Sequence, residues 1–400
     1  MKKRVGILTS GGDCPGLNAT IRGVAKALYA RMGDNVEIVG ILNGYSGLIN
    51  GDYKEMCEDD FRGILTLGGT ILGTKRTPFK MMRVVEDDNI DKVAAMKKTY
   101  KEAKLDCLLC LGGNGTHKTA NLLSQEGLNI IGLPKTIDND LCITDHTPGF
   151  GSAAKYVATT MQEIIRDSSV YSIPSVTIVE IMGRHAGWLT ASSAVLHAYG
   201  EPAPHLVYVP ETHFSAERFL HDVEQEMAKH KAVIVAVSEG VSVPEGVQSG
   251  LVDNFGHKYL SGIGKYLEQL VRDTFGCKVR SVELNVMQRC SSHLSSKTDI
   301  DEAEQIGAAG VQCALRGETG RVMIFRRIHN KPYTVVMEPA DASQIANREK
   351  FLPREFLTPA GNNISDEAMS YFLPLIQGEL NLMMRGGIPM HFTIQESVLK

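Results

Sequence analysis

Residues 105–140 read LDCLLCLGGNGTHKTANLLSQEGLNIIGLPKTIDND, and this stretch decides the fold class. The apolar runs Leu105–Leu111 and Ile130–Leu133 have the length of buried strands, and Thr116–Gln125 between them has helical periodicity. A strand, a helix and a second strand in this order indicate a βαβ unit with parallel strands. The glycine-rich turn and the loop Pro134–Asp140 then follow the carboxyl ends of two strands, where open parallel sheets bind ligands.

The same alternation of short apolar runs and helical stretches continues on both sides of this unit. Further strands are predicted at Val5–Thr9, Val36–Leu42, Ser175–Ile181, Leu206–Val209 and Ala232–Val237. We therefore predict an α/β protein with two doubly wound, mostly parallel-sheet (Rossmann-like) domains flanking an active-site cleft, with a change of unit near Gly149–Gly151.

Composition excludes several classes of protein. Lysine and arginine number 42 against 46 aspartate and glutamate, a formal charge of 42 − 46 = −4, so we expect no nucleic-acid partner. No run reaches the roughly 18 apolar residues of a membrane span, and the apolar run before Gly11 is too short for a signal peptide, so we expect a cytoplasmic protein with no membrane partner.

Cys107 and Cys110 would point to opposite faces of one strand, which predicts buried free thiols rather than a metal or redox pair.

Three glycine clusters lie at predicted strand ends, in Thr9–Gly16, Gly68–Arg76 and Gly112–Thr116. Glycine lets backbone amides approach an anion, and a helix N-terminus adds positive potential, so converging clusters indicate a polyphosphate cradle. The alternative interpretation is that these clusters are tight turns of an α/β sheet and bind no ligand. A P-loop is excluded because Thr74-Lys75 reverses the required order, and a dinucleotide fingerprint is weakened because Lys118 stands where a glycine is needed.

Charged residues in two further loops supply candidate chemistry. Asp138 and Asp140 can have different roles in a phosphotransferase. One can accept a proton from the attacking hydroxyl, while the other holds a metal or keeps its neighbour correctly ionised. Lys135 is close enough in sequence to offset phosphate charge. An Asx-rich turn with no catalytic role is the alternative. Arg184 begins another strand-end loop and can pair bidentately with a phosphoryl group, whereas the neighbouring Trp188 is expected in the core.

This ordered set of motifs resembles the 6-phosphofructokinase family. The match covers about residues 3–330 and rests on Thr9–Gly16, Gly68–Arg76, Gly112–Thr116, Pro134–Asp140, Met182–Arg184, Arg280 and Arg289. The resemblance implies transfer of a phosphoryl group to the 1-hydroxyl of fructose 6-phosphate, in a homodimer or homotetramer whose substrate sites are built across subunits. It also implies a phosphoryl-donor-binding domain of residues 1–149 plus about 290–335, and a sugar-phosphate-binding domain of residues 150–289 plus about 336–400 with a C-terminal helical extension.

The resemblance also implies a role for individual residues. The phosphoryl donor would be held by Gly11, Arg76, Thr77, Gly113, Asn114, Gly115 and Thr116. The sugar phosphate would be contacted by Thr136, Asp138, Met182, Gly183, Arg184, Glu239, Arg280 and Arg289. Asp138 would be the general base on the 1-hydroxyl, with Thr136 beside it and Asp140 supporting it, and Arg184 would stabilise the transferring phosphoryl group.

Donor choice depends on Gly115 and Lys135. In the family, glycine at the first position leaves room for the α-phosphate of ATP, whereas aspartate there restricts the enzyme to pyrophosphate. Lysine at the second position is common in pyrophosphate-using members but also occurs with the glycine in some ATP-using branches. We therefore expect ATP and Mg²⁺, with Asn114 in place of the family's usual acidic metal ligand, and pyrophosphate as the alternative donor.

Several positions depart from the family pattern near the acceptor. Ser175 and Val286 replace an arginine and a histidine, and Cys290-Ser291-Ser292 replaces a glycine pair. Another sugar phosphate such as sedoheptulose 7-phosphate therefore remains an alternative acceptor, and a catalytically silent sugar-phosphate-binding regulatory homologue is an alternative function. A kinase of the NAD or diacylglycerol type would share the glycine-rich loop, but the Pro134–Asp140 and Met182–Arg184 segments argue against it.

Overall fold

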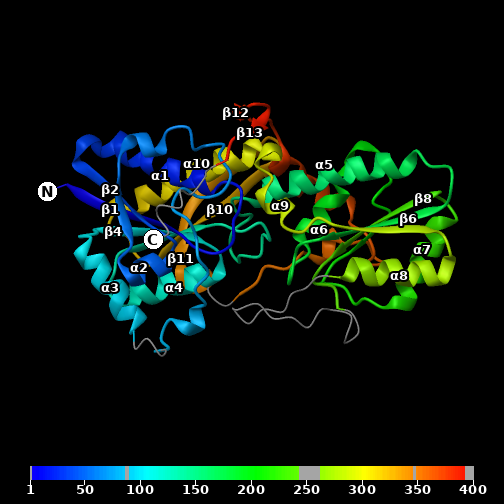
Figure 1. Cartoon of the computed structure of the whole chain (residues 1–400), viewed down its shortest axis with the longest axis horizontal. Coiled ribbons are helices and arrows are strands. Elements are labelled where there is room, and N and C mark those ends of the chain that lie inside the picture. Colours follow the sequence, from blue (N-terminus) through cyan, green and yellow to red (C-terminus); the bar gives the residue numbers. More distant parts are fainter. Residues whose placement is uncertain (1, 86–89, 243–261, 346–347, 392–400) are drawn as a thin grey trace.

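Two β-sheets, each covered by helices on both faces, form the two halves of the molecule (Figure 1). The computed structural model describes residues 2–85, 90–242, 262–345 and 348–391. The larger sheet has seven strands in the order β11-β10-β5-β4-β1-β2-β3, and the smaller has four in the order β7-β8-β6-β9. Only the β2–β3 and β10–β11 pairs in these two sheets are antiparallel, which confirms the predicted α/β class with mostly parallel sheets.

The bounds of the seven predicted strands agree closely with the apolar runs of the sequence, whereas β3, β9, β10 and β11 were not predicted. The larger sheet contains β1 (Lys3–Thr9), β2 (Val36–Ile41), β3 (Tyr53–Met56), β4 (Cys107–Gly112), β5 (Ile130–Pro134), β10 (Arg321–Asn330) and β11 (Tyr333–Asp341). The smaller sheet contains β6 (Ser175–Ile181), β7 (Leu206–Tyr208), β8 (Ala232–Ser238) and β9 (Lys278–Glu283). A short hairpin near the C-terminus is formed by β12 (Met384–Arg385) and β13 (Ile388–Pro389).

Helices follow most strands, as the βαβ pattern predicts. The α-helices are α1 (Leu17–Met32), α2 (Tyr45–Asn50), α3 (Lys92–Glu102), α4 (Asn114–Gln125), α5 (Phe150–Ser169), α6 (Trp188–Ser192), α7 (Ala216–Met227), α8 (Ile263–Phe275), α9 (Met287–Cys290), α10 (Lys297–Leu315), α11 (Ala342–Ile345) and α12 (Met369–Phe372). The short 3₁₀ turns are η1 (Gly33–Asn35), η2 (Glu58–Phe61), η3 (Phe79–Met81), η4 (Ser193–Tyr199), η5 (Ser292–Leu294), η6 (Arg354–Phe356), η7 (Asp366–Ala368) and η8 (Leu373–Ile376).

Alternating side chains of the central strand β4 fill two separate cores. Cys107, Leu109 and Leu111 face the core under α1 and α10, whereas Leu108 and Cys110 face the core under α2, α3 and α4 (Figure 1). This is the period-two pattern of a strand buried on both faces. Both thiols are free and buried, which confirms the prediction of buried free thiols, and burial raises the pKa of each to about 12.

Helices α1 and α10 approach each other so closely that glycine is required at the crossing. A Cβ atom added to Gly23 would lie 1.9 Å from the carbonyl oxygen of Glu304, and one added to Gly307 would lie 2.3 Å from the carbonyl oxygen of Thr20. Any side chain at either position would therefore force the two helices apart.

We expect Gly23→Ala to lower the free energy of unfolding by about 1–3 kcal/mol, because overpacking outweighs the roughly 1 kcal/mol by which alanine is favoured over glycine in a helix. Urea unfolding of the whole chain measures this change. Ala30→Ser, on the exposed side of the same helix, should change the value by less than about 0.5 kcal/mol. A Gly23→Ala variant as stable as the wild type would show that the helices do not meet at Gly23.

The C-terminal quarter differs from the expectation in two respects. Strand β11 is one continuous element of the larger sheet up to Asp341, so the chain does not leave this sheet at the expected boundary near residue 335. The described segment after residue 348 contains only short turns (η6, η7, α12 and η8) and the β12–β13 hairpin rather than a longer helical extension. Part of it reaches the smaller sheet, where the carbonyl of Asn362 accepts a hydrogen bond from the amide of Val207 at 2.8 Å. The assignment of functions to two domains stays a prediction.

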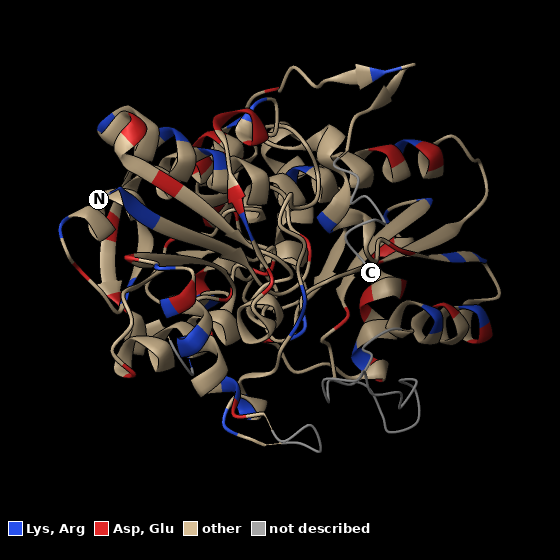
Figure 2. Cartoon of the chain, turned by 60° about the vertical axis from the view of Figure 1, so that its left-hand side comes forward, with Lys and Arg blue, Asp and Glu red and all other residues tan. Residues whose placement is uncertain are grey.

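Charged residues of both signs are spread along the outer helices of both halves (Figure 2), in agreement with the nearly balanced composition. Within the described ranges, no helix is both long enough and apolar enough to cross a membrane.

Candidate active site

Loops from both halves enclose a cleft of about 640 Å³. The loops after β1, β4 and β5 line it from the larger sheet, and those after β6 and β8 line it from the smaller one. Such a position, outside the carboxyl ends of parallel strands, is where the sequence predicts a ligand site. Except for Gly183 and Arg280, every residue predicted to bind substrate or donor lines this cleft.

Three cationic side chains converge on the first glycine loop. Lys135 is buried, its ammonium group donates a hydrogen bond to the carbonyl of Gly12, and its backbone amide donates to the carbonyl of Gly112 at 3.0 Å. A Cβ atom on Gly12 would lie 3.2 Å from Nη2 of Arg76 and 3.3 Å from Nη1 of Arg289, so both guanidinium groups flank this loop. This concentration of positive charge suits the phosphate groups of a donor and a sugar phosphate.

The two predicted carboxylates lie on one turn and both face the cleft. Asn139 between them has a left-handed φ of 55°, and the hydroxyl of Thr136 accepts a hydrogen bond from the amide of Asp138 at 3.1 Å. Burial and the neighbouring charge of Asp140 raise the pKa of Asp138, while the cations of Lys135, Arg184 and Arg76 oppose this rise. Burial also raises the pKa of Asp140. The expected Asx-rich turn is therefore present, and it places two carboxyl groups with raised pKa values in one cavity, which is typical of functional sites.

The smaller half contributes the loop Met182–Arg184 and Glu239. Gly183 has a φ of 139°, which favours glycine, and a Cβ atom there would lie 2.7 Å from the carbonyl oxygen of Ala186. Its carbonyl accepts a hydrogen bond from the hydroxyl of Ser238 at 2.6 Å, and its amide donates to Glu239 at 3.4 Å. Burial and the charge of Asp138 raise the pKa of Glu239 to about 7. Gly183 thus shapes the loop that brings Met182 and Arg184 to the cleft wall.

Asn114, the predicted metal ligand, begins α4 and lines the cleft. Its side-chain oxygen is buried and has no hydrogen-bond partner among the described residues, which fits an atom reserved for a ligand. The described part of the chain holds no cluster of three or more His, Cys, Asp or Glu side chains suited to a metal. An amide oxygen is a ligand that Mg²⁺ accepts, so the residues present fit a Mg²⁺ ion with Asn114 as a protein ligand.

Arg280 lies outside the cleft. It is on β9, its guanidinium group pairs with Asp167 at 3.1 Å, and it borders a small surface depression together with Ser175 and Lys278. One copy of the chain therefore does not bring Arg280 to the other predicted residues.

Two acidic residues of the cleft were not predicted. Asp13 follows the first glycine pair, and its pKa is raised by burial although the amide of Cys14, Lys135 and Arg289 oppose the shift. The sequence signal for Asp13 was its place inside a glycine-rich loop at the end of a predicted strand. Glu349 comes from the C-terminal segment, and it lies beside Asp140, whose pKa its charge helps to raise. No motif near residue 349 indicates this placement.

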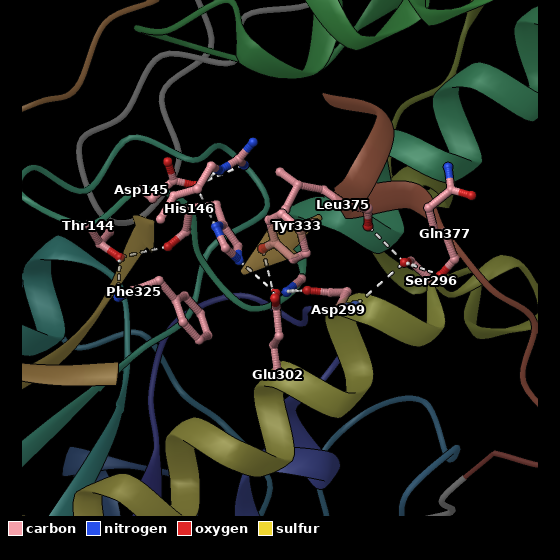
Figure 3. A network of polar contacts seen from close by, with 12 residues as sticks. Thr144, Asp145, His146, Ser296, Asp299, Glu302, Phe325, Tyr333, Leu375 and Gln377 are labelled. Atoms are coloured by element: carbon pink, nitrogen blue, oxygen red, sulfur yellow. Dashed lines mark hydrogen bonds and ion pairs between the residues drawn. The ribbon is translucent and has the colours of Figure 1, made fainter. Parts of the chain in front are cut away.

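Behind the cleft, a buried polar network ties the chain after the carboxylate loop to the larger half (Figure 3). His146 lies between two carboxylates, with Nδ1 2.8 Å from Asp145 and Nε2 2.7 Å from Glu302 of α10. Glu302 also accepts a hydrogen bond from the hydroxyl of Tyr333 on β11 at 2.7 Å. This network fixes the segment that follows Asp140.

The cleft gathers cations and paired carboxylates at the ends of parallel strands, and phosphoryl transfer requires these groups. The profile of the phosphofructokinase family matches residues 4–314. The chain belongs to the phosphofructokinase family, which confirms the resemblance drawn from the motifs.

Relatives in this family bear names with both donors. The pyrophosphate–fructose 6-phosphate 1-phosphotransferase of Xanthomonas campestris is 33% identical over 96% of this chain and 94% of the relative. The ATP-dependent 6-phosphofructokinase of Spirochaeta thermophila is 39% identical over 80% of this chain and 87% of the relative. The solved pyrophosphate-dependent phosphofructokinase of Marinobacter aquaeolei superposes with a TM-score of 0.85 at 28% identity, covering 97% of this chain and 95% of that one. The Xanthomonas alignment extends into the C-terminal segment, beyond the residues 3–330 that the motifs cover.

Proposed function

We propose that this protein transfers the terminal phosphoryl group of ATP to the 1-hydroxyl of fructose 6-phosphate, giving fructose 1,6-bisphosphate and ADP in the cytoplasm, as in glycolysis. The observation that carries the proposal is the single cleft in which Asp138 and Asp140 share the walls with Arg184, Lys135 and Arg76. Phosphoryl transfer needs cations around the moving group and a carboxylate at the acceptor.

In this reaction Asp138 accepts the proton of the 1-hydroxyl group while the hydroxyl oxygen attacks the phosphorus atom. Asp140 holds a second negative charge beside it, which raises the proton affinity of the base. Arg184 and Lys135 offset the charge that develops on the phosphoryl oxygens. Mg²⁺, when bound, would neutralise charge on the donor phosphates, with Asn114 as its protein ligand.

The proposed choice of ATP rests on Gly115. A Cβ atom at this position would meet no atom within 4 Å, so the missing side chain leaves open space at the cleft. That space would accept the α-phosphate of a nucleotide. Pyrophosphate is the second candidate donor, favoured by Lys135 and by the name of the Xanthomonas relative. Loss of catalysis is the least favoured reading because Asp138, Asp140 and Arg184 are all present in the cleft.

The proposed enzyme is a homodimer or homotetramer. Arg280 lies outside the cleft of its own chain, so it can contact the sugar phosphate only in the cleft of a neighbouring subunit. This arrangement agrees with the expectation of substrate sites built across subunits.

The raised pKa of Asp138 predicts a pH dependence. A carboxyl group acts as a base only when ionised, so kcat/KM should fall as the pH drops through its raised pKa, well above the ordinary aspartate value of about 4. Initial rates between pH 5 and 9 measure this acid limb, and Glu239→Gln tests which carboxyl group carries it. A kcat/KM that stays constant down to pH 5 would contradict the assignment of a buried base.

The proposal is tested by comparing donors and acceptors in one set of rate measurements. At saturating fructose 6-phosphate with Mg²⁺, kcat/KM for ATP should exceed that for pyrophosphate by at least about 100-fold, and sedoheptulose 7-phosphate should be the poorer acceptor. A preference for pyrophosphate would overturn the choice of donor. No turnover with either donor would favour the silent regulatory homologue.

A further inference from the structure

Asn139 separates the two cleft carboxylates and points away from the cleft. Its side chain is completely buried, while Asp138 and Asp140 on either side line the cavity. The amide nitrogen of Asn139 donates a hydrogen bond to the hydroxyl of Tyr371 at 2.8 Å, and its oxygen accepts one from the ammonium group of Lys350 at 2.9 Å. Both partners come from the C-terminal segment.

The ammonium group of Lys350 makes three hydrogen bonds behind the turn that carries Asp138 and Asp140, which we call the carboxylate turn. Besides Asn139, its ammonium group donates to the carbonyls of Thr144 at 3.2 Å and Asp145 at 2.6 Å, so all three donors of the lysine are used. The same ammonium group lies 4.6 Å from the centre of the Trp188 ring.

The backbone of Lys350 also holds this turn. Its amide donates to the carbonyl of Asp140 at 2.8 Å, and Leu141 and Glu349 form an antiparallel bridge beside this bond. One residue therefore holds both the side chain of Asn139 and the main chain of Asp140.

Tyr371, the second partner of Asn139, is held by residues of the larger half. The hydroxyl of Tyr371 donates to the carbonyl of Asp145 at 2.5 Å, and the carboxylate of Asp145 accepts hydrogen bonds from Arg327 of β10 at 2.9 and 3.1 Å. Asp145 also contacts His146, whose other nitrogen meets Glu302 (Figure 3). Lys350 thus bridges the carboxylate turn and a segment fixed by buried polar contacts.

We propose that Lys350 is a positioning residue for phosphoryl transfer, which holds Asn139 in its left-handed conformation so that Asp138 and Asp140 both face the cleft. The proposal rests on the proposed function. A non-glycine residue with φ of 55° is strained and persists only when its surroundings hold it. Without the lysine, the Asn139 oxygen and two carbonyls lose their donor, and the turn is free to relax.

Burial lowers the pKa of Lys350 to about 7, so its ammonium group is charged on the acid side of neutral pH. It lowers the proton affinity of Asp140, as His185 does, against the opposing effects of burial and of Glu349. Asp138 is faced by Asp140 and by the cations of Lys135, Arg184 and Arg76, and these three cations stay in place when Lys350 is replaced. Removal of the Lys350 charge should raise the pKa of Asp140, so that the pair with both carboxylates ionised, which the proposed reaction uses, forms only at higher pH.

The test compares Lys350→Met with Lys155→Met in the full chain. Lys155 is a matched control because it is buried on α5 and also binds the C-terminal segment, donating to the carbonyl of Gly378 at 2.7 Å and to Glu379 at 2.8 Å. Lys350→Met should lower kcat at least 10-fold, change KM for the donor less than about threefold, and move the acid limb of kcat/KM to higher pH. Lys155→Met should leave kcat within twofold and the acid limb in place.

Two further measurements separate positioning from misfolding and from failure of the proposed function. Amide hydrogen exchange of residues 136–141 should be faster in Lys350→Met than in the wild type and unchanged in Lys155→Met, whether or not the wild type makes fructose 1,6-bisphosphate. Tyr371→Phe, a milder change, should lower kcat several-fold. The proposal is overturned if folded Lys350→Met keeps kcat and exchange close to wild type, or if its kcat falls only in proportion to the folded fraction. A wild type without turnover would overturn the proposed function, while the exchange data would still decide whether Lys350 holds the turn.

Discussion

Asp138→Asn is expected to lower kcat by about 100- to 10,000-fold, the usual contribution of a general base. The amide keeps the shape of the carboxyl group but cannot take the proton of the sugar hydroxyl. Because the base acts mainly in the transition state, KM for the donor should change little. Steady-state rates with both substrates varied measure the two effects separately.

The same substitution should not destabilise the protein. Burial and the charge of Asp140 disfavour ionisation of Asp138, and Asp138 in turn raises the pKa of Glu239, so removing its charge relieves repulsion. Asp222→Asn is a suitable control, because Asp222 lies on α7 and accepts a hydrogen bond from Tyr208 far from the cleft. A large rise in both KM values, or an Asp138→Asn variant that unfolds more easily than wild type, would point to a structural role instead.

Gly115→Asp is expected to lower kcat/KM for ATP by at least about 100-fold while leaving the protein folded. The position is in the first turn of α4 and has open space around it, where an acidic residue gains about 0.3–1 kcal/mol from the helix dipole. The carboxylate would project into the cleft and repel the nucleotide phosphates. Activity with pyrophosphate, which lacks the α-phosphate of a nucleotide, should be affected much less.

Two smaller substitutions separate the effects of size and charge at this position. Gly115→Ala adds only a methyl group to open space and should keep kcat/KM for ATP within several-fold, whereas Gly115→Asn adds the bulk of aspartate without its charge. Intact ATP activity in Gly115→Asp would contradict the proposed basis of donor choice.

Much of the fold could be predicted because its central strands are continuous apolar runs followed by amphipathic helices. β4, β5, β6 and β8 begin or end within two residues of the predicted runs. β9 was missed because Lys278–Glu283 contains only two apolar residues, Val279 and Val282, among charged and polar ones. This strand lies at the edge of the smaller sheet and is only partly buried. Strands β10 and β11, which pair with each other as a hairpin, were missed because charged residues such as Arg326, Arg327 and Glu338 interrupt their apolar positions. Strand β10 joins the larger sheet through β5, which lies about half the chain earlier.

The candidate site was predictable where function depends on a local pattern. Glycines at strand ends and the Pro134–Asp140 loop carry their chemistry in a few adjacent residues, and the structure brings them to one cleft. The support behind that loop was not predictable. Lys350 and Tyr371 contact Asn139 across 211 and 232 residues of chain, and neither lies in a motif. The motifs also did not predict that Arg280, on the edge strand β9, lies outside the cleft of its own chain.

The most direct measurement of the central claim is phosphorus-31 NMR of a single reaction containing the wild-type protein, fructose 6-phosphate, ATP and Mg²⁺. We predict a new phosphate monoester on carbon 1 of the sugar that appears together with the β-phosphate resonance of ADP, at equal rates and only when Mg²⁺ is present. The account would be contradicted if ATP stayed intact and the new ester formed only when pyrophosphate was supplied, or if no ester formed on carbon 1 with either donor.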